Sequence, residues 1–226
     1  AHRVIELLYE AGMPRDVVQL LPGDGPTVGS VLTSDPRITG VVFTGGTDTA
    51  QIINRALAAR DNAPLPTLIA ETGGMNAMIV DSTALPEQVV VDVIQSAFQS
   101  AGQRCSALRV LYLQEDVADR VIEILKGAMS ELRIGDPRDL GTDVGPVIDE
   151  DARKGLMEHI EKLKGENRLV AETPMSAEPT QHGTFVPPVA FTIDSIDALT
   201  REQFGPVLHI VRFKARELDK VINDIN

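Results

Sequence analysis

The sequence has one cysteine and no tryptophan, and aromatic residues make up only 4% of its 226 residues. A single cysteine cannot form a disulfide within the chain, which is typical of proteins in a reducing compartment such as the cytoplasm. No run approaches the roughly 18 apolar residues that a membrane-spanning helix needs, and no signal-peptide pattern is present. We therefore expect a cytoplasmic chain whose core is built from Val, Ile, Leu and Ala.

Positive charge is also scarce, because 33 acidic residues outnumber 21 basic ones and the net charge is −12. Nucleic acid and anionic membranes would repel such a chain, so contact with either is not expected. The histidines show no spacing typical of metal ligands. We expect no metal site, and we interpret each histidine as structural or exposed. They are His2, His159, His182 and His209.

The hydrophobic pattern predicts strands that alternate with helices, which is typical of a parallel sheet covered by helices. The predicted fold class is therefore α/β, and residues 62–66 and 172–183 are interpreted as loops. Strands are expected at residues 17–21, 40–43, 67–70, 76–80, 109–113, 168–171, 185–191 and 207–213. Helices are expected at residues 2–11, 27–32, 50–59, 86–98 and 117–129, after a cap at Asp149, and at the C-terminal end.

The chain begins and ends inside amphipathic helical patterns, with no capping residue before His2 and no glycine after Ile222. Helices normally carry such signals at their termini. We therefore expect the chain to be an internal part of a longer polypeptide.

The stretch around the only cysteine, residues 98–109 (FQSAGQRCSALR), is the first candidate for chemistry. Cys105 follows a glycine turn at the end of a predicted helix, where a nucleophile could be presented. On this stretch alone the structural interpretation is favoured, because most single cysteines in soluble chains are small buried apolar residues.

Three further motifs could carry chemistry: FTGGT at 43–47, ETGG at 71–74 and EQFGPV at 202–207. The first could bring the backbone close to an anionic ligand at a helix N-terminus, or simply reverse the chain. Glu71 could act as a general base, although a solvated carboxylate is favoured when the motif is taken alone. Glu202 and Phe204 could face a ligand or form an ordinary turn. G-x-G-x-x-G, G-x-S-x-G and P-loop patterns are absent.

Taken together, these motifs resemble the aldehyde dehydrogenase superfamily. The matching pieces occur in the family's order: FTGGT, ETGG, GQRC at 102–105, the dipeptide GP at 145–146 and EQFGPV. Longer stretches at 68–81, 96–120 and 185–188 are similar to the pyrroline-5-carboxylate dehydrogenase domain of the bacterial proline utilization A proteins. Several independent motifs agree over nearly the whole chain, so the resemblance favours a catalytic Cys105.

The resemblance implies an aldehyde dehydrogenase-like fold and an activity. Residues 1–70 would be part of a Rossmann-like NAD-binding domain, and residues 71–226 an α/β catalytic domain that is incomplete at its C-terminus. The implied reaction is NAD-dependent oxidation of L-glutamate γ-semialdehyde to glutamate in proline catabolism. Cys105 would be the nucleophile, because thiolates are strongly nucleophilic near neutral pH, and Glu71 would activate the hydrolytic water. Arg104 and Arg109 could help to hold a thiolate.

The resemblance also assigns the NAD contacts. Where this chain has Gly46 and Ala50, the family often has serine and glycine, so no serine hydroxyl is available here for a phosphate. No flavin site is assigned. Thr44, Gly45 and Gly46 would border the dinucleotide, Glu202 would hydrogen-bond the nicotinamide ribose, and Phe204 would pack beside the nicotinamide.

The implied partners are a small aldehyde, the other domains of the parent polypeptide and further copies of the full-length protein. The family's oxyanion asparagine and its ribose-binding lysine are expected upstream of Ala1. The substrate-anchoring loop and the oligomerisation strand are expected beyond Asn226. Loss of one oxyanion donor typically costs roughly 10²–10³ in rate, so we expect little dehydrogenase activity from this chain alone.

Two alternatives remain open at this point. The parent enzyme could oxidise another aldehyde, whereas a reductive relative that acts on an acyl phosphate is less favoured because hydrolysis needs a base such as Glu71. The chain could also be a non-catalytic structural or interaction module.

Overall fold

The computed structural model describes residues 1–61 and 64–226, so the predicted loop at 62–66 lies partly outside the described residues. The chain divides into two compact units, Ala1–Thr72 and Gly73–Asn226, which are described separately below. The division falls two residues after the predicted boundary at residue 70. Within the described ranges, no helix is long and apolar enough to cross a membrane.

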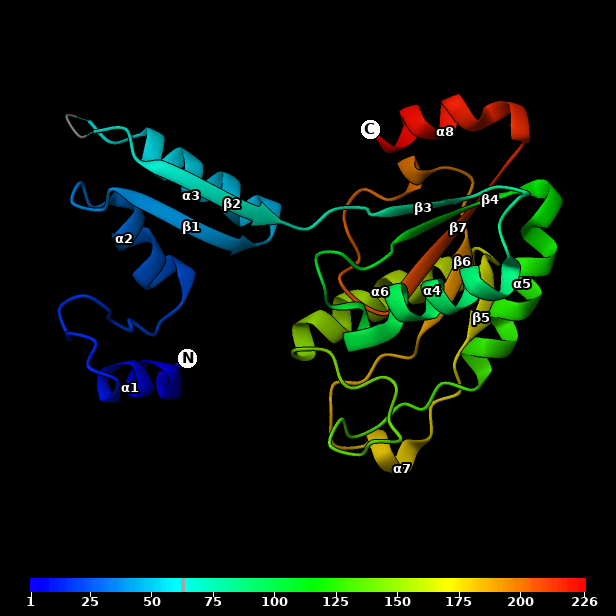
Figure 1. Cartoon of the computed structure of the whole chain (residues 1–226), viewed down its shortest axis with the longest axis horizontal. Coiled ribbons are helices and arrows are strands. Elements are labelled where there is room, and N and C mark those ends of the chain that lie inside the picture. Colours follow the sequence, from blue (N-terminus) through cyan, green and yellow to red (C-terminus); the bar gives the residue numbers. More distant parts are fainter. Residues whose placement is uncertain (62–63) are drawn as a thin grey trace. The chain divides into compact units, whose positions relative to one another are not determined.

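The first unit is built around a strand–helix–strand motif (Figure 1). Strand β1 (Gly40–Gly45) runs parallel to β2 (Thr67–Thr72), and α3 (Thr47–Ala58) connects them. Parallel strands need such a crossover connection. The elements that precede this motif are α1 (His2–Glu10), a π-helical turn η1 (Gly25–Gly29) and α2 (Ser30–Ser34).

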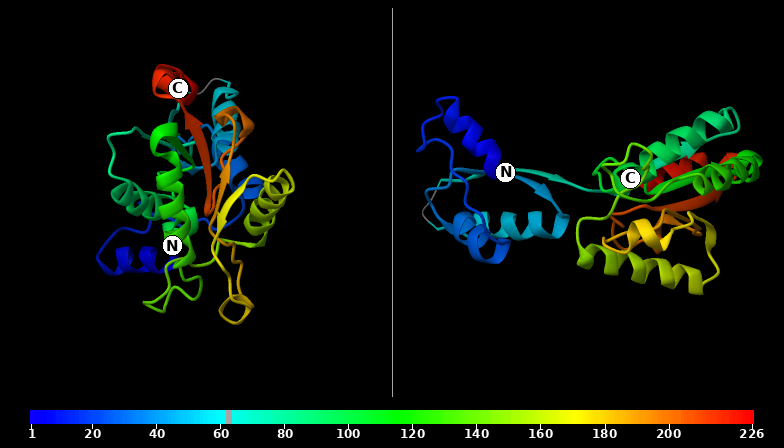
Figure 2. Two further views of the ribbon diagram at one scale, coloured as in Figure 1. Left: turned by 90° about the vertical axis from the view of Figure 1, so that its right-hand side faces the viewer. Right: turned by 90° about the horizontal axis from the view of Figure 1, so that it is seen from below.

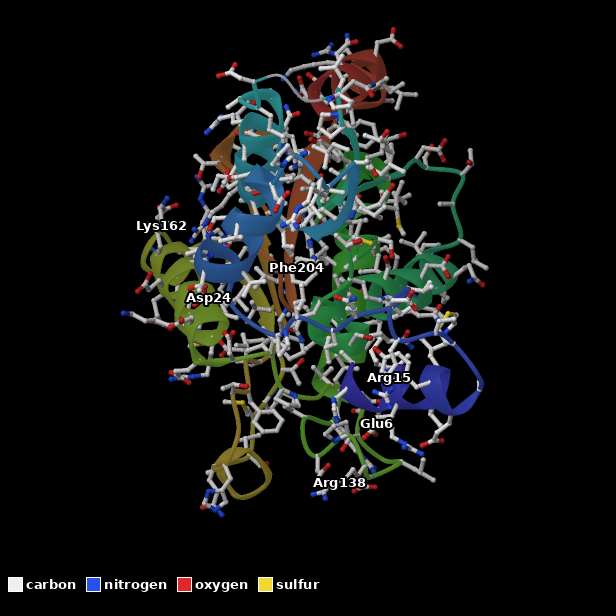
Figure 3. The ribbon with its side chains drawn as sticks, turned by 90° about the vertical axis from the view of Figure 1, so that its left-hand side faces the viewer. Glu6, Arg15, Asp24, Arg138, Lys162 and Phe204 are labelled. Carbon is white, nitrogen blue, oxygen red and sulfur yellow. The ribbon has the colours of Figure 1, made fainter. Side chains whose placement is uncertain are left out.

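Two predictions for the first unit are wrong. Residues 17–21 form no strand, because nothing in the described part of the chain pairs with them, and Val17 remains 66% exposed. A strand needs a hydrogen-bonded neighbour, which hydrophobicity alone does not supply. The helical segment predicted to begin at Thr27 begins earlier, because the side chain of Asp24 (labelled in Figure 3) accepts a 2.7 Å hydrogen bond from the Thr27 amide.

The second unit holds a mixed sheet of five strands in the order β3-β4-β7-β6-β5. All neighbours are parallel except β5, which pairs antiparallel with β6 at the edge. The alternation of strands and helices confirms the predicted α/β class. The strands are β3 (Ala77–Val80), β4 (Val110–Gln114), β5 (Leu169–Glu172), β6 (Val189–Thr192) and β7 (Val207–Phe213).

Helices cover both faces of this sheet. Helices α4 (Pro86–Phe98) and α5 (Glu115–Ser130) lie on one face, and α6 (Glu150–Gly165) lies on the other (Figure 2). Because successive side chains of a strand point to opposite faces, β4 contributes to two apolar clusters. Leu111 and Leu113 pack in the larger cluster, with residues of α4 and α5. Val110 and Tyr112 pack in the smaller one, with Val221 of α8 (Leu218–Ile225).

Local signals set several boundaries in the second unit. Asp149 caps α6 as predicted, accepting a 2.8 Å hydrogen bond from the Ala152 amide. The strand predicted from residue 185 begins only at Val189, because Pro187 and Pro188 have no N–H to donate to a sheet. The predicted loop at 172–183 contains the single helical turn α7 (Ala177–Thr180).

Two histidines meet in the second unit. His209 on β7 is buried, and its Nε2 lies 2.8 Å from Nε2 of His159 on α6. The Nδ1 of His209 lies 3.2 Å from the Arg109 carbonyl oxygen. A carbonyl only accepts, so Nδ1 donates, and the neutral His209 ring accepts a hydrogen bond from His159 through Nε2. Burial lowers the pKa of both rings, and that of His209 falls to about 4.

We expect the His209 ring to make folding pH-dependent. The unfolded chain takes up this proton near pH 6.5, whereas the folded chain takes it up only near 4. The free energy of unfolding should therefore fall as the pH falls through this window, by up to roughly 3 kcal/mol. Urea unfolding at a series of pH values, followed by circular dichroism, should show a smaller slope for His209→Gln.

The matched control is His182→Gln, which replaces an exposed histidine and should keep the slope of the unsubstituted chain. Parallel curves for all three proteins would contradict the role of His209.

Candidate active site

The loop that carries Cys105 begins with an unusual left-handed turn. After α4, the residues Ser100, Ala101 and Gly102 have φ angles of 55°, 52° and 65°. The left-handed region costs roughly 1–2 kcal/mol for each residue that has a Cβ. Ser100 and Ala101 therefore store strain one turn before the cysteine, and the surrounding contacts must stabilise this turn.

Gln103 and Arg104 anchor the loop to neighbouring segments. Gln103 Oε1 accepts a 2.8 Å hydrogen bond from the Ile148 amide, and its Nε2 donates to the Pro146 carbonyl at 3.3 Å. Arg104 Nη2 donates to the Gln95 carbonyl at 2.9 Å. The guanidinium of Arg104 is thus directed toward the end of α4.

Asn76 holds the other side of the same loop. Its side-chain Nδ2 donates to the carbonyl oxygens of Cys105 at 2.7 Å and of Ala107 at 2.9 Å. Its own backbone carbonyl accepts hydrogen bonds from the amides of Arg109 and Val110. Asn76 therefore joins the start of β3 to the cysteine loop through both its side chain and its main chain.

Arg109 lies at the centre of the site with all five of its N–H groups hydrogen-bonded, although its side chain is only 1% exposed. Nε and Nη2 donate to Glu202 Oε1 at 3.0 and 2.9 Å. Nη1 donates to the carbonyls of Gly102 at 2.7 Å and Gly205 at 3.1 Å. Nη2 also donates to the Arg104 carbonyl at 3.2 Å. We call Arg109 and these four partners the arginine network.

Glu202 lies in a narrow place between Arg109 and Gly73. A Cβ added at Gly73 would collide with Glu202 Oε2, so a residue larger than glycine would displace the carboxylate. Burial lowers the pKa of the Arg109 guanidinium, and the Glu202 carboxylate opposes that change. The guanidinium keeps its charge, as arginine does throughout the range in which proteins are folded. Removing one partner of a buried ion pair typically costs about 3–5 kcal/mol.

The groups that face solvent lie beside this buried pair. Cys105 is an exposed free thiol, between the buried residues Gly102 and Ala107. The ring of Phe204, labelled in Figure 3, is 45% exposed, and its centroid lies 5.2 Å from the Arg109 guanidinium carbon. The second unit therefore brings the predicted residues Cys105, Glu202 and Phe204 into one locality through Arg109.

The first unit brings the other predicted residues together. Because β1 and β2 are parallel, Thr44 pairs with Glu71 and Gly45 with Thr72, at the carboxyl ends of both strands. Gly46 follows as the N-cap of α3. Thr44, Gly45, Gly46 and Glu71 are all exposed. Glu71 thus belongs to the first unit and Cys105 to the second.

A profile of the aldehyde dehydrogenase family matches residues 1–226, and the chain therefore belongs to this family. It is 56% identical to the bifunctional protein PutA of Klebsiella aerogenes, over 98% of this chain and 17% of the relative. It is 36% identical to a 1-pyrroline-5-carboxylate dehydrogenase of Geobacillus kaustophilus, over 100% of this chain and 44% of the relative.

Solved structures that match this chain include a PutA protein and an aldehyde dehydrogenase. The crystal structure of a mutant of Bradyrhizobium japonicum Proline Utilization A (PutA) superposes with a TM-score of 0.93 and 52% identity, covering 99% of this chain and 22% of that one. Betaine aldehyde dehydrogenase from Staphylococcus aureus, solved in complex with NAD⁺, superposes with a TM-score of 0.90 and 27% identity. The match covers 98% of this chain and 44% of that one. The chain spans less than half the length of each of these four proteins.

Each unit, taken by itself, offers groups that suit a part of a dinucleotide. A Cβ added at Gly46 would meet nothing within 4 Å, so the start of the 12-residue helix α3 is open to an anion. Asp48 in the first turn of α3 weakens this attraction. Glu202 offers a carboxylate whose Oε1 is fixed by Arg109, which suits a ribose hydroxyl. Among the described residues, no three His, Cys, Asp or Glu side chains are grouped to hold a metal ion.

Some residues that shape the loop are not apparent from the sequence. Asn76 and the left-handed turn at 100–102 carry no signal of their own, and the GQRC motif does not indicate that Gln103 binds residues 146 and 148. The sequence suggests Arg109 only as a support for the thiolate, yet its donors are directed at Glu202 and backbone carbonyls. One signal was available, because a lone charge at the start of the apolar strand β4 requires a buried partner.

We expect Gly102→Ala to destabilise the second unit. A Cβ at this position would lie 2.8 Å from the Ala97 carbonyl oxygen and against the Gly205 carbonyl, with φ at +65°. Because the obstacles are backbone atoms, the free energy of unfolding should fall by more than about 2 kcal/mol. Urea unfolding measures this loss.

The matched control is Gly127→Ala in the last turn of α5, where an added Cβ meets nothing within 4 Å. It should raise stability by about 0.5–1 kcal/mol, since alanine favours helix. A Gly102→Ala variant as stable as the unsubstituted chain would show that the described loop conformation is wrong.

Proposed function

We propose that this chain supplies the nucleophile of an NAD-dependent dehydrogenase that oxidises L-glutamate γ-semialdehyde to L-glutamate. The observation that carries the proposal is the exposed thiol of Cys105 on a loop held by the arginine network, next to Glu202. The 56% identity to a PutA protein and the 36% identity to a 1-pyrroline-5-carboxylate dehydrogenase support this substrate.

The chain's own residues would act as follows. The Cys105 thiolate adds to the aldehyde carbon, which forms a carbon–sulfur bond and places the negative charge on the former carbonyl oxygen. A bound NAD would accept the hydride that leaves this carbon; as the hydride leaves, the oxygen re-forms its double bond to the carbon, and the adduct becomes a thioester of Cys105. Glu202, fixed by Arg109, would hold the nicotinamide ribose, and Phe204 would pack beside the nicotinamide. Thr44, Gly45 and Gly46 would border the rest of the dinucleotide.

Release of the acid needs a base, and we assign that role to Glu71. Its carboxylate would take a proton from water, and the resulting hydroxide would attack the thioester carbon and expel the Cys105 thiolate. Glu71 is an exposed residue of the first unit, next to Thr44 across the strand pair. Under this assignment the first unit supplies the base and the dinucleotide contacts at residues 44–46, whereas the second unit supplies the nucleophile together with Glu202 and Phe204.

The two assigned groups should fail in different ways in a full-length polypeptide that contains this chain. Cys105→Ser should reduce NADH formation from glutamate semialdehyde by at least about 10³-fold. Glu71→Gln should slow the steady state by about 10²–10⁴-fold, yet retain a rapid burst of NADH as the thioester accumulates. Stopped-flow absorbance of NADH and intact-protein mass spectrometry measure the burst and the adduct.

Glu87→Gln is the matched control, because Glu87 is an exposed acid on α4 whose described partner is Arg120. It should leave both phases unchanged. Full steady-state activity of Glu71→Gln would sink the hydrolytic role of Glu71. A higher kcat/KM for a simple aliphatic aldehyde than for glutamate semialdehyde would sink the substrate assignment.

A further inference from the structure

We infer that Arg109 is a positioning residue that couples the Cys105 loop (residues 100–108) to the Glu202 turn (residues 201–205). The proposed nucleophile and the proposed cofactor contact are thereby held as one unit. The inference rests on the proposed function for the roles of Cys105 and Glu202. The coupling itself rests on the arginine network, because Arg109 donates to residues on both segments.

The carbonyl groups of the Cys105 loop are bound by two side chains. Arg109 binds the carbonyls of Gly102 and Arg104, before the cysteine. Asn76 binds those of Cys105 and Ala107, at and after it. Four carbonyls are thus bound by the side-chain donors of Arg109 and Asn76, while Cys105 and Ser106 are exposed. This arrangement holds the strained turn at 100–102 and presents the thiol.

The Cys105 loop and the Glu202 turn are in direct backbone contact. Glycine at 102 lets the two backbones touch, because a Cβ at this position would collide with the Gly205 carbonyl. Nη1 of Arg109 donates to the carbonyls of Gly102 and Gly205. Its Nη2 donates to the Arg104 carbonyl and to the Glu202 carboxylate. A displacement of the Glu202 turn must therefore pull the same guanidinium that holds the cysteine loop.

Neither lysine nor methionine can replace all the hydrogen bonds of the Arg109 side chain. A lysine ammonium has only three donors and cannot reproduce a planar five-donor fork. Lysine can keep the charge opposite Glu202, but it leaves some of the loop carbonyls without a partner. Methionine keeps much of the apolar stem and removes every donor. The two variants therefore separate the ion pair from the hold on the loop.

Hydrogen–deuterium exchange on this chain tests the coupling without any need for dehydrogenase activity. In Arg109→Met, amide exchange should rise at least about tenfold in both residues 100–108 and 201–205, while the strands β4 and β7 keep their protection. In Arg109→Lys, exchange should rise mainly in residues 100–108. The matched control Arg212→Met removes a partly exposed arginine paired with Asp119 and should change neither segment.

Kinetics in the full-length polypeptide give the functional readout. Arg109→Lys should lower kcat by between about 10- and 100-fold through misplacement of the nucleophile, with the KM for the aldehyde unchanged. A failed activity assay with the expected exchange pattern would count against the proposed function and leave the coupling supported.

Three results would overturn the inference. All three concern Arg109→Met: unchanged exchange in both segments, an equal rise across the whole second unit, or a rise in only one of the two segments. If Arg109→Met does not fold, Glu202→Gln decides, because it leaves Arg109 in place. Coupling then requires faster exchange in residues 100–108, and unchanged exchange there overturns it.

Discussion

The buried guanidinium of Arg109 is the interaction on which the rest of the site depends. A charge removed from water must have its donors satisfied, because each unpaired donor would cost a large part of its hydration. The fold meets this requirement with Glu202 and three backbone carbonyls. Those carbonyls belong to the loop and the turn that carry the proposed chemistry, so satisfying the charge also fixes the geometry of the site.

The same constraint accounts for several other features. Glycine at 102 permits the left-handed turn and the close approach to Gly205. Glycine at 73 leaves room for the second carboxylate oxygen of Glu202. Asn76 completes the set by holding the carbonyls that Arg109 does not reach. The strain in Ser100 and Ala101 is thus offset by contacts from three separate segments, which is typical of loops that present functional groups.

Much of the fold follows from local sequence patterns. The periodic apolar positions of α4, the capping side chain of Asp149 and the β-branched residues of β7 each specify their element nearly to the residue. Residues 17–21 have the composition of a strand, but composition cannot supply a pairing partner. The prolines at 187 and 188 block a sheet that hydrophobicity alone would begin there.

The candidate site was predictable only in part, for a physical reason. Cys105, Glu71 and Glu202 stand in motifs whose order identifies the family. Arg109 and Glu202 are 93 residues apart, and Asn76 is 29 residues from Cys105. Contacts at such separations depend on the order of strands in the sheet, which the sequence pattern does not specify. The turn at 100–102 was hidden for the same reason, since its φ angles are imposed by partners elsewhere in the chain.

Arg109 and Glu202 act as one unit with the Cys105 loop. A double-mutant cycle tests it most directly, with kcat measured in the full-length polypeptide for Arg109→Lys, Glu202→Gln and the double variant. Coupling predicts that the effects are not additive, with an interaction free energy of at least about 1 kcal/mol and a double variant little worse than the poorer single one. Effects that add to within about 0.5 kcal/mol would contradict the account, because they are what independent sites produce.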